Sequence, residues 1–288
     1  MPRMAARTVV VLATFLALRM VGGAADKEGS CYVNNEPGGL TIKHRVTKVK
    51  CPTQFAFIVN ILDPVVQTHS CTGVLIDRKT VAVPASCVQT RSHGIRKFPI
   101  VRVGSYNLNT HDEPGKDEEY TISTILIHES YDGNPQNGGD LALLELKEPL
   151  TNCTPISEDF MDISNCKRGS LIGVGWFGPN THQGPPPNQL EVLPGMSFVD
   201  REKCTSLLDG MPQGAICACS DPAANIVWDH GSLLLCNGRH LVGLASYMPE
   251  TNEYNPYVYT HMAEYKRWIK ERDHRSSNVH FNSDDREL

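Results

Sequence analysis

The chain has 288 residues, 10 cysteines and a formal net charge of −5 at pH 7. This length suits one large all-β domain or two smaller ones. The acidic balance argues against a nucleic-acid partner, and beyond the N-terminal leader no stretch is long and apolar enough to span a membrane.

The first 25 residues have the pattern of a secretory signal. Arg3 and Arg7 precede an apolar run from Thr8 to Leu18, and small residues follow as far as Ala25. A signal peptide over 1–25 predicts a secreted, extracellular protein, and the cysteines would form disulfides in an oxidising compartment. Removal of this segment takes away three arginines, so the mature chain is more acidic still.

A short pro-segment or lead, 26–45, precedes the first strand patterns. It contains turn-forming residues and ends in a basic run. The bond between Arg45 and Val46 is a possible cleavage site for a trypsin-like enzyme. The alternative is that Arg45 belongs to a solvated basic face.

No metal or cofactor is expected from the sequence. Cys217 and Cys219 are separated by a single residue, which is not the spacing of a zinc site, and no His-Glu-x-x-His motif occurs. The cysteines are therefore assigned to disulfides.

Short strand patterns begin at residue 55. They are rich in apolar and β-branched residues and are separated by polar turns, which is typical of an all-β sandwich or a pair of barrels. In chain order the predicted strands are 55–62, 71–76, 80–84, 100–103, 121–127, 140–146, 171–176, 191–199, 233–236, 240–246 and 257–260.

Only two stretches are predicted to be helical. Asp200 can cap a short helix that extends through Leu208. The stretch 262–272 has an apolar face at helical spacing, and 273–288 is predicted to be a polar, disordered tail. The apolar face consists of Met262, Tyr265, Trp268 and Ile269.

Several motifs follow one another in the order found in a single enzyme family. They include Cys71-Thr72-Gly73-Val74-Leu75-Ile76, Val83-Pro84-Ala85-Ser86-Cys87, Asp140-Leu141-Ala142-Leu143-Leu144 and Trp228-Asp229-His230-Gly231-Ser232. Over 46–272 the chain resembles the chymotrypsin-like (trypsin-fold) serine proteases. The resemblance implies two packed six-stranded antiparallel β-barrels with the site between them, followed by a C-terminal helix.

The residues at the positions of the catalytic triad are altered. By the resemblance, Ser86 stands at the imidazole position, Asp140 at the carboxylate position and His230 at the hydroxyl position. Proteolysis by this fold needs an activated hydroxyl, an imidazole that takes its proton and a carboxylate that orients the imidazole. Only the carboxylate is kept, so we predict that the protein is not an enzyme.

Three bulky side chains stand where the resemblance implies glycine. Trp228 replaces the glycine whose backbone N–H faces the oxyanion, and Met248 and Tyr257 replace glycines in the walls of the specificity pocket. We predict that they block the site. The alternative, that Met248 and Tyr257 are ordinary core residues, also leaves no room for a substrate side chain. Asp229, whose counterpart in the family binds the new N-terminal amine, is retained without an evident partner.

The resemblance also implies disulfide pairs. These are Cys71–Cys87, Cys204–Cys217, Cys166–Cys236 and Cys31–Cys153, while the remaining Cys51 and Cys219 could bond to each other. Asn152 begins the motif Asn152-Cys153-Thr154 and is a candidate glycosylation site.

Together these features favour a secreted serine protease homologue that acts by binding proteins. The chain is similar to the noncatalytic homologues of arthropod extracellular cascades, which act as cofactors or regulators of active proteases in clotting, melanisation and immune signalling. The expected partners are other secreted proteins, either active proteases or their substrates. Two alternatives are an active hydrolase with a rearranged Ser86/His230 site and a ligand-binding antimicrobial homologue, which the acidic charge disfavours.

Overall fold

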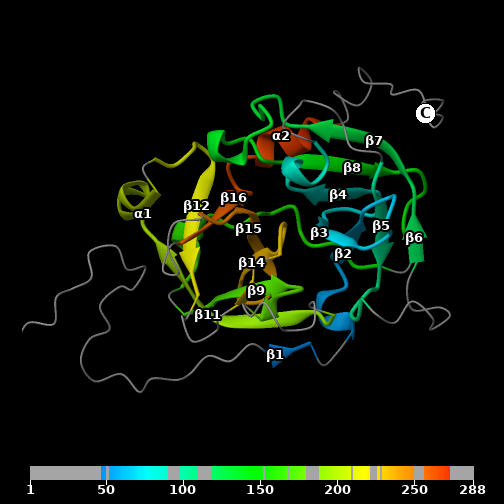
Figure 1. Ribbon diagram of the computed structural model, residues 1–288, viewed down its shortest axis with the longest axis horizontal. Coiled ribbons are helices and arrows are strands. Elements are labelled where there is room, and N and C mark those ends of the chain that lie inside the picture. Colours follow the sequence, from blue (N-terminus) through cyan, green and yellow to red (C-terminus); the bar gives the residue numbers. More distant parts are fainter. Residues whose placement is uncertain are drawn as a thin grey trace, which may run out of the picture.

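The computed structural model describes residues 47–49, 52–89, 98–108, 118–151, 153–167, 169–179, 188–208, 210–220, 226–227, 229–249 and 256–272. In these ranges the chain is mostly β, with two barrel-like sheets side by side and few helices (Figure 1). The predicted fold class, an all-β pair of barrels with a C-terminal helix, is confirmed.

The first barrel is built on a sheet with the strand order β6-β5-β2-β3-β4-β8-β7. The two edge strands, β6 and β7, are separated by Thr121 alone, so one ribbon runs from one edge of the sheet to the other and curls it round. The strands are β2 (Ile58–Leu62), β3 (His69–Leu75), β4 (Thr80–Val83), β5 (Ile100–Val103), β6 (Glu118–Tyr120), β7 (Ile122–Ile127) and β8 (Ala142–Leu146).

The second barrel has the order β1-β11-β12-β16-β15-β14-β9 and is closed by a further pairing of β11 with β9. The closed ring thus has six strands, and β1 is added beside β11. The strands are β1 (Thr47–Lys48), β9 (Leu171–Gly175), β11 (Glu191–Val199), β12 (Ala215–Cys219), β14 (Leu233–Cys236), β15 (His240–Tyr247) and β16 (Tyr257–His261), and a separate ribbon pairs β10 (Gly178–Pro179) with β13 (Ile226–Val227).

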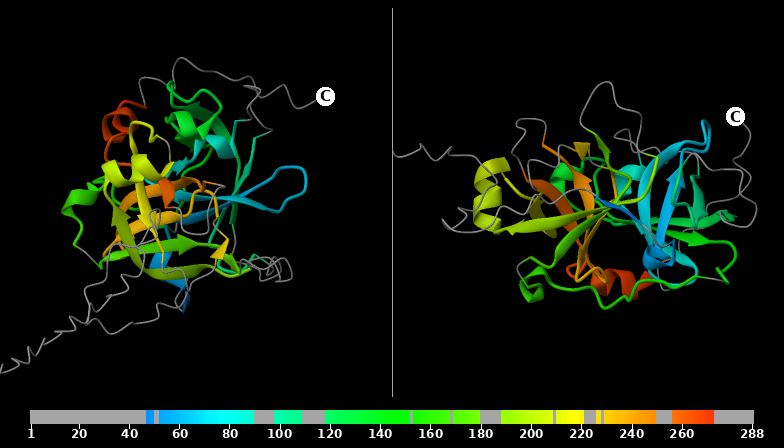
Figure 2. Two further views of the ribbon diagram at one scale, coloured as in Figure 1. Left: turned by 60° about the vertical axis from the view of Figure 1, so that its left-hand side comes forward. Right: turned by 90° about the horizontal axis from the view of Figure 1, so that it is seen from below.

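The interior of the molecule explains the apolar runs of the sequence. Strands such as β4 and β14 are buried along their whole length, so their residues do not alternate with polar ones. One hydrophobic cluster fills the first barrel and continues between the barrels to Trp176 and Trp268, and a second cluster around Met196 and Tyr259 fills the second barrel. The two barrels, which lie side by side in Figure 2, therefore share part of one core.

The first predicted helix is confirmed, and the second is shorter than predicted. In α1 (Arg201–Leu208) the carboxylate of Asp200 accepts the N–H of Lys203 at 2.9 Å, as expected of an N-cap. The second helix, α2 (Lys266–Lys270), is shorter than the predicted 262–272, because the preceding turns are closed by three-residue hydrogen bonds such as Tyr265 N–H to the Met262 carbonyl. Its predicted apolar face is nevertheless buried. None of the helices in the described part of the chain has the length and apolar character to cross a membrane.

Four short 3₁₀ turns connect strands of the two barrels. They are η1 (Pro52–Phe55), η2 (Ala85–Cys87), η3 (Pro135–Asn137) and η4 (Ile163–Asn165). The strand predicted over 55–62 therefore starts later, at Ile58, because Phe55 closes η1.

Three of the predicted disulfides are present. They are Cys71–Cys87, Cys166–Cys236 and Cys204–Cys217. The predicted bridge from Cys31 to Cys153 is wrong, because Cys153 is a free thiol, and burial raises its pKa. Cys219 is also disulfide-bonded, to a cysteine outside the described residues.

His261, at the end of β16, is expected to make the fold sensitive to acid. It is 5% exposed, its Nε2 accepts the N–H of Ile163 at 3.4 Å, and burial lowers the pKa of its ring. The unfolded chain takes up a proton as the pH falls through about 6.5, whereas the folded ring resists it, so stability is lost from there downward. The charged groups that face this ring are Asp162 and Glu264, and both act to raise its pKa, against the effect of burial.

The measurement is the free energy of unfolding at several pH values between 7.5 and 5. A single proton changes this energy by at most about 1.4 kcal/mol per pH unit. His261→Gln keeps an acceptor without a titrating ring and should flatten the decline between pH 6.5 and the lower pKa of the folded ring. Identical slopes for the two proteins would contradict the assignment.

Candidate functional site

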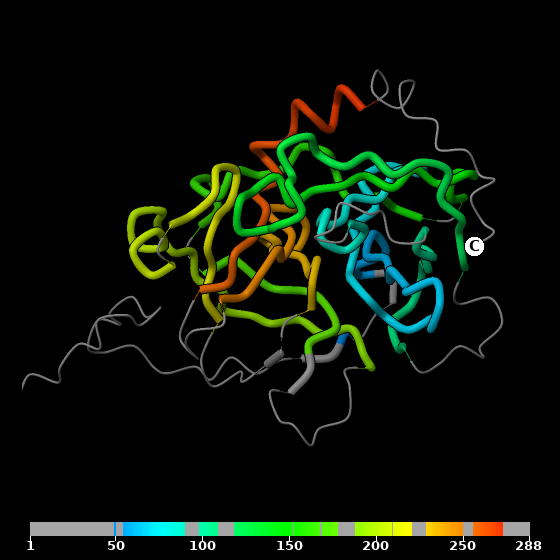
Figure 3. Tube along the Cα trace, turned by 45° about the horizontal axis from the view of Figure 1, so that its top comes forward, coloured from blue at the N-terminus to red at the C-terminus, as the bar shows by residue number. Residues whose placement is uncertain are grey.

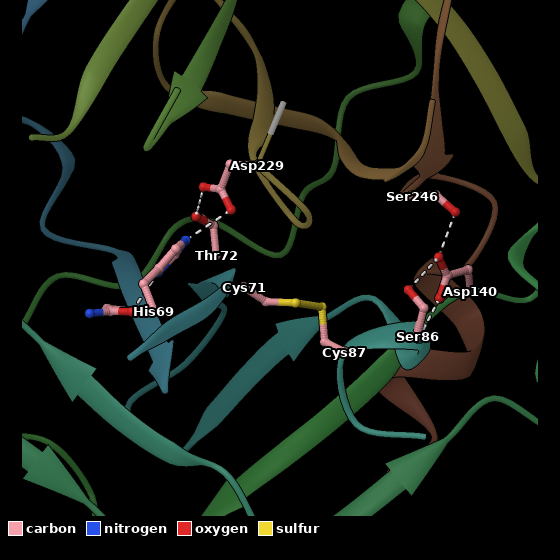
Figure 4. Close-up of a disulfide and its surroundings, with 9 residues drawn as sticks. His69, Cys71, Thr72, Ser86, Cys87, Asp140, Asp229 and Ser246 are labelled. Atoms are coloured by element: carbon pink, nitrogen blue, oxygen red, sulfur yellow. Dashed lines mark hydrogen bonds and ion pairs between the residues drawn. A yellow bond between two sulfur atoms is a disulfide. The ribbon is translucent and has the colours of Figure 1, made fainter. Parts of the chain in front are cut away.

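The centre of the site is the carboxylate of Asp140, which lies just before β8 at the junction of the two barrels. Its side chain is buried and is reached from both barrels (Figure 4). From the first barrel, the N–H of Ser86 donates to Oδ1 at 2.8 Å and the Ser86 hydroxyl donates to Oδ2 at 3.1 Å. From the second, the hydroxyl of Ser246 in β15 donates to Oδ2 at 2.5 Å, and Thr260 in β16 holds the Asp140 carbonyl.

These contacts decide what Asp140 can do. Burial raises the pKa of its carboxyl above the usual value, while hydrogen bonds from Ser246 and Ser86, and the charge of His230, oppose the rise. Both carboxylate oxygens are occupied by hydroxyl and amide donors rather than by an imidazole. The carboxylate of Asp140 therefore orients the hydroxyl of Ser86. That Ser86 stands at the position of the general base stays a prediction from the resemblance.

His230 lies in the loop between β13 and β14, and its side chain is exposed. The loop itself is held by backbone hydrogen bonds from both barrels. The N–H of Thr72 in β3 donates to the His230 carbonyl at 2.8 Å, and the N–H of Gly231 donates to the Ala245 carbonyl at 2.8 Å. In the described part of the chain no hydrogen bond joins the His230 ring to Ser86 or Asp140. Figure 3 shows the orange strands of the second barrel facing the cyan strands of the first across this junction.

Asp229 has partners that the sequence did not reveal. His69, at the start of β3, places Nε2 at 3.0 Å from Oδ1 of Asp229, and its Nδ1 lies 2.7 Å from Oδ1 of Asn60. The hydroxyl of Thr72 and the N–H of Trp176 (3.0 Å) both donate to Oδ2 of Asp229. Figure 4 shows this cluster and the Asp140 cluster on opposite sides of the Cys71–Cys87 disulfide. The signal that could have pointed to it is a histidine two positions before Cys71.

The residues predicted to block the specificity pocket have different environments. Tyr257 begins β16 and packs against the core cluster of the second barrel. Met248, just after β15, is 50% exposed, so its thioether lies at the surface. Of these two residues only Tyr257 packs against the interior, and the blocked pocket stays a prediction.

Several predicted positions lie outside the described residues. They are Trp228, Asn152, the possible cleavage site at Arg45 and Val46, and the cysteines Cys31 and Cys51. Within the described ranges no group of three His, Cys, Asp or Glu side chains is arranged to hold a metal ion.

Comparisons with known proteins agree with this architecture. Trypsin iota from Drosophila melanogaster is 26% identical over 265 residues, which cover 90% of this chain and 95% of that protein. Trypsin from Sus scrofa is 26% identical over 209 residues, covering 71% and 85%. The structure of neuropsin, a serine protease expressed in the limbic system of mouse brain, shares the fold, with a TM-score of 0.64, 22% identity and coverage of 78% of this chain and 98% of that chain.

The family match extends through both barrels. A family model described as Trypsin matches residues 44–269, from just before β1 into α2. The chain belongs to the trypsin family.

Proposed function

We propose that this trypsin-family homologue does not hydrolyse peptide bonds and acts instead by binding other secreted proteins. The observation that carries the proposal is the hydrogen bond from the Ser86 hydroxyl to the buried carboxylate of Asp140. A serine hydroxyl is too weak a base at neutral pH to take a proton from a nucleophile. The carboxylate therefore orients a group that cannot act as the general base.

The position of the nucleophile supports the same proposal. His230 occupies it with an exposed ring that has no orienting hydrogen bond from Asp140 or Ser86 in the described residues. An exposed imidazole that makes no hydrogen bond to the Ser86 hydroxyl is neither an activated nucleophile nor a positioned base for Ser86. The rearranged Ser86/His230 hydrolase is thus disfavoured.

Loss of catalysis leaves a scaffold that is well suited to binding. The loop of His230 is held between the barrels by Thr72 and Ala245, and three disulfides between described cysteines stabilise the fold. The disulfides and the N-terminal signal pattern support an extracellular location. By its resemblance to noncatalytic homologues of arthropod cascades, the protein is proposed to be a cofactor or regulator of an extracellular protease cascade of the immune, melanisation or clotting type. Its partners are active proteases or their substrates.

Purified protein is expected to show no casein hydrolysis and no labelling by a fluorophosphonate probe, with pig trypsin as the positive control. Loss of the triad side chains in this fold typically lowers the rate by about 10⁶-fold. His230→Ala should leave this null result unchanged. Labelling of Ser86 that disappears in His230→Ala would establish the rearranged hydrolase instead.

The proposed role as a cofactor or regulator is tested in the source fluid. Source fluid depleted of this protein should show a changed rate of endogenous trypsin-like activity, and purified protein should restore the original rate. Restoration by His230→Ala as well as by the unchanged protein would separate binding from chemistry. An unaltered rate after depletion would contradict a cofactor or regulator role.

A further inference from the structure

A small cavity lies on the first barrel, over the strands β4, β8 and β7. It encloses about 230 Å³, and none of its lining residues takes part in the site around Asp140. Charged, hydroxyl and aliphatic side chains all line it. We propose that this cavity binds a single neutral sugar ring, a pyranose, which is a binding activity separate from the proposed function of the protein.

The floor of the cavity is set by the register of the three strands, which are neighbours in the sheet (Figure 1). Glu145 in β8 lies opposite both Thr80 in β4 and Thr124 in β7. On the same face of β8, two positions earlier, Leu143 lies opposite Leu126 of β7. The floor therefore has one polar row and, next to it, one apolar row.

One wall is an ion pair between Asp77 and Arg272. Oδ1 of Asp77 accepts the N–H groups of Lys79 at 2.7 Å and Thr80 at 3.0 Å. Oδ2 of Asp77 lies 2.5 Å from Nη2 of Arg272, and the same nitrogen lies 3.0 Å from Glu158. This wall is held by contacts within the protein, so it shapes the cavity without offering an uncompensated charge to a ligand.

The groups with remaining hydrogen-bonding capacity are Lys79, Glu145 and the two threonines. Nζ of Lys79 lies 3.1 Å from Oε1 of Glu145, and these side chains are 44% and 33% exposed. An ammonium has three donors and a carboxylate has about four acceptor sites, so this one contact leaves both groups able to bind a ligand. The hydroxyls of Thr80 and Thr124 can each donate and accept.

Charge and volume limit the class of ligand. Two carboxylates and two cations line the cavity, so an ion of either sign would meet a like charge as well as an opposite one. Sites for drug-sized ligands enclose about 300–1,000 Å³, and this cavity is smaller. A nucleotide or a lipid chain is therefore excluded, and a small neutral molecule is favoured.

A sugar ring matches both rows of the floor. Neighbouring hydroxyls of a pyranose can accept from the Lys79 ammonium and donate to the Glu145 carboxylate while the two side chains stay paired. The C–H groups of the ring are apolar enough to lie on Leu126 and Leu143, the second of which is 3% exposed. A zwitterion such as a free amino acid would have to separate the pair between Lys79 and Glu145.

Saturation-transfer NMR on the purified full-length protein tests the proposal. The probes are D-glucose, D-mannose, D-galactose and N-acetyl-D-glucosamine. We expect at least one to bind saturably with a Kd that is roughly millimolar, as suits a small and partly open site. The methyl glycoside of that sugar distinguishes the source, because it binds equally well only if the ring can be the end of a glycan. Failure of all four probes well above millimolar concentration, or binding of free leucine without any sugar, would overturn the proposal.

Two variants and a matched control place the binding in this cavity. Glu145→Gln removes the charged acceptor beside Lys79 and should raise the Kd by about tenfold. Thr124→Tyr places a ring over the floor and should abolish binding, and tyrosine suits a strand. Asp159→Asn breaks the pair with Lys266, which also lies at the surface, and should leave the Kd unchanged. All three should unfold near the urea concentration of the unchanged protein. Unchanged binding in either cavity variant would place the sugar elsewhere and overturn the assignment.

Discussion

Replacing Gly231 by alanine is expected to destabilise the protein by more than about 4 kcal/mol. Gly231 has a φ of 80°, in the left-handed region, and an added Cβ would lie 1.9 Å from the carbonyl oxygen of Thr72. That oxygen belongs to the backbone of β3, so it cannot move aside without disturbing the hydrogen bond from Thr72 N–H to His230. The loop that carries His230 would be forced away from the first barrel.

Gly169→Ala is the matched control for this effect. Gly169 has nearly the same φ, 81°, but no atom lies within 4 Å of its added Cβ. Backbone strain alone should then cost about 1–2 kcal/mol. The measurement is the free energy of unfolding in urea for the two variants. Equal losses would mean that contact with Thr72 plays no part.

Asp229→Ala is expected to cost about 3–5 kcal/mol, the second large effect. The carboxylate is 4% exposed and accepts hydrogen bonds from the Trp176 N–H and the Thr72 hydroxyl, beside Nε2 of His69. Alanine would leave these buried groups without an acceptor, and each unpaired group carries a desolvation penalty.

The control for Asp229 is a partly exposed carboxylate that forms an ion pair at the surface. Glu271→Gln weakens the pair with Arg267 on α2, which is exposed, and should cost less than about 1 kcal/mol. Both variants are compared by urea unfolding at pH 7. A loss below about 1 kcal/mol for Asp229→Ala would show that the cluster around His69 contributes little to stability.

Most strands could be predicted because they depend on local patterns. Residues 191–199 and 233–236 were predicted with the bounds that β11 and β14 have in the structure. The strand β12 was missed. It consists of Ala215-Ile216-Cys217-Ala218-Cys219, which has little β-branched character, and its strand conformation comes from pairing with β11 and β16 on its two edges.

The disulfides, too, were predictable from the sequence only in part. The pair Cys71–Cys87 closes a short loop within one motif, and the resemblance identified it correctly. The pairing of Cys153 with Cys31 failed, because a motif match carries no information on the distance between a lead segment and either barrel.

By itself the sequence determined the family and the positions of most strands, because these depend on residue identity and on periods of a few residues. The exchange of serine and histidine at the triad positions stays a prediction from the resemblance. Only the tertiary structure decided which groups meet. Asp229 and His69 are 160 positions apart, and Asp140 and Ser246 are 106 positions apart, yet each pair is within hydrogen-bonding distance. Such contacts are made by closing two barrels against each other, and barrel closure depends on strand pairings across the whole chain that no short stretch encodes.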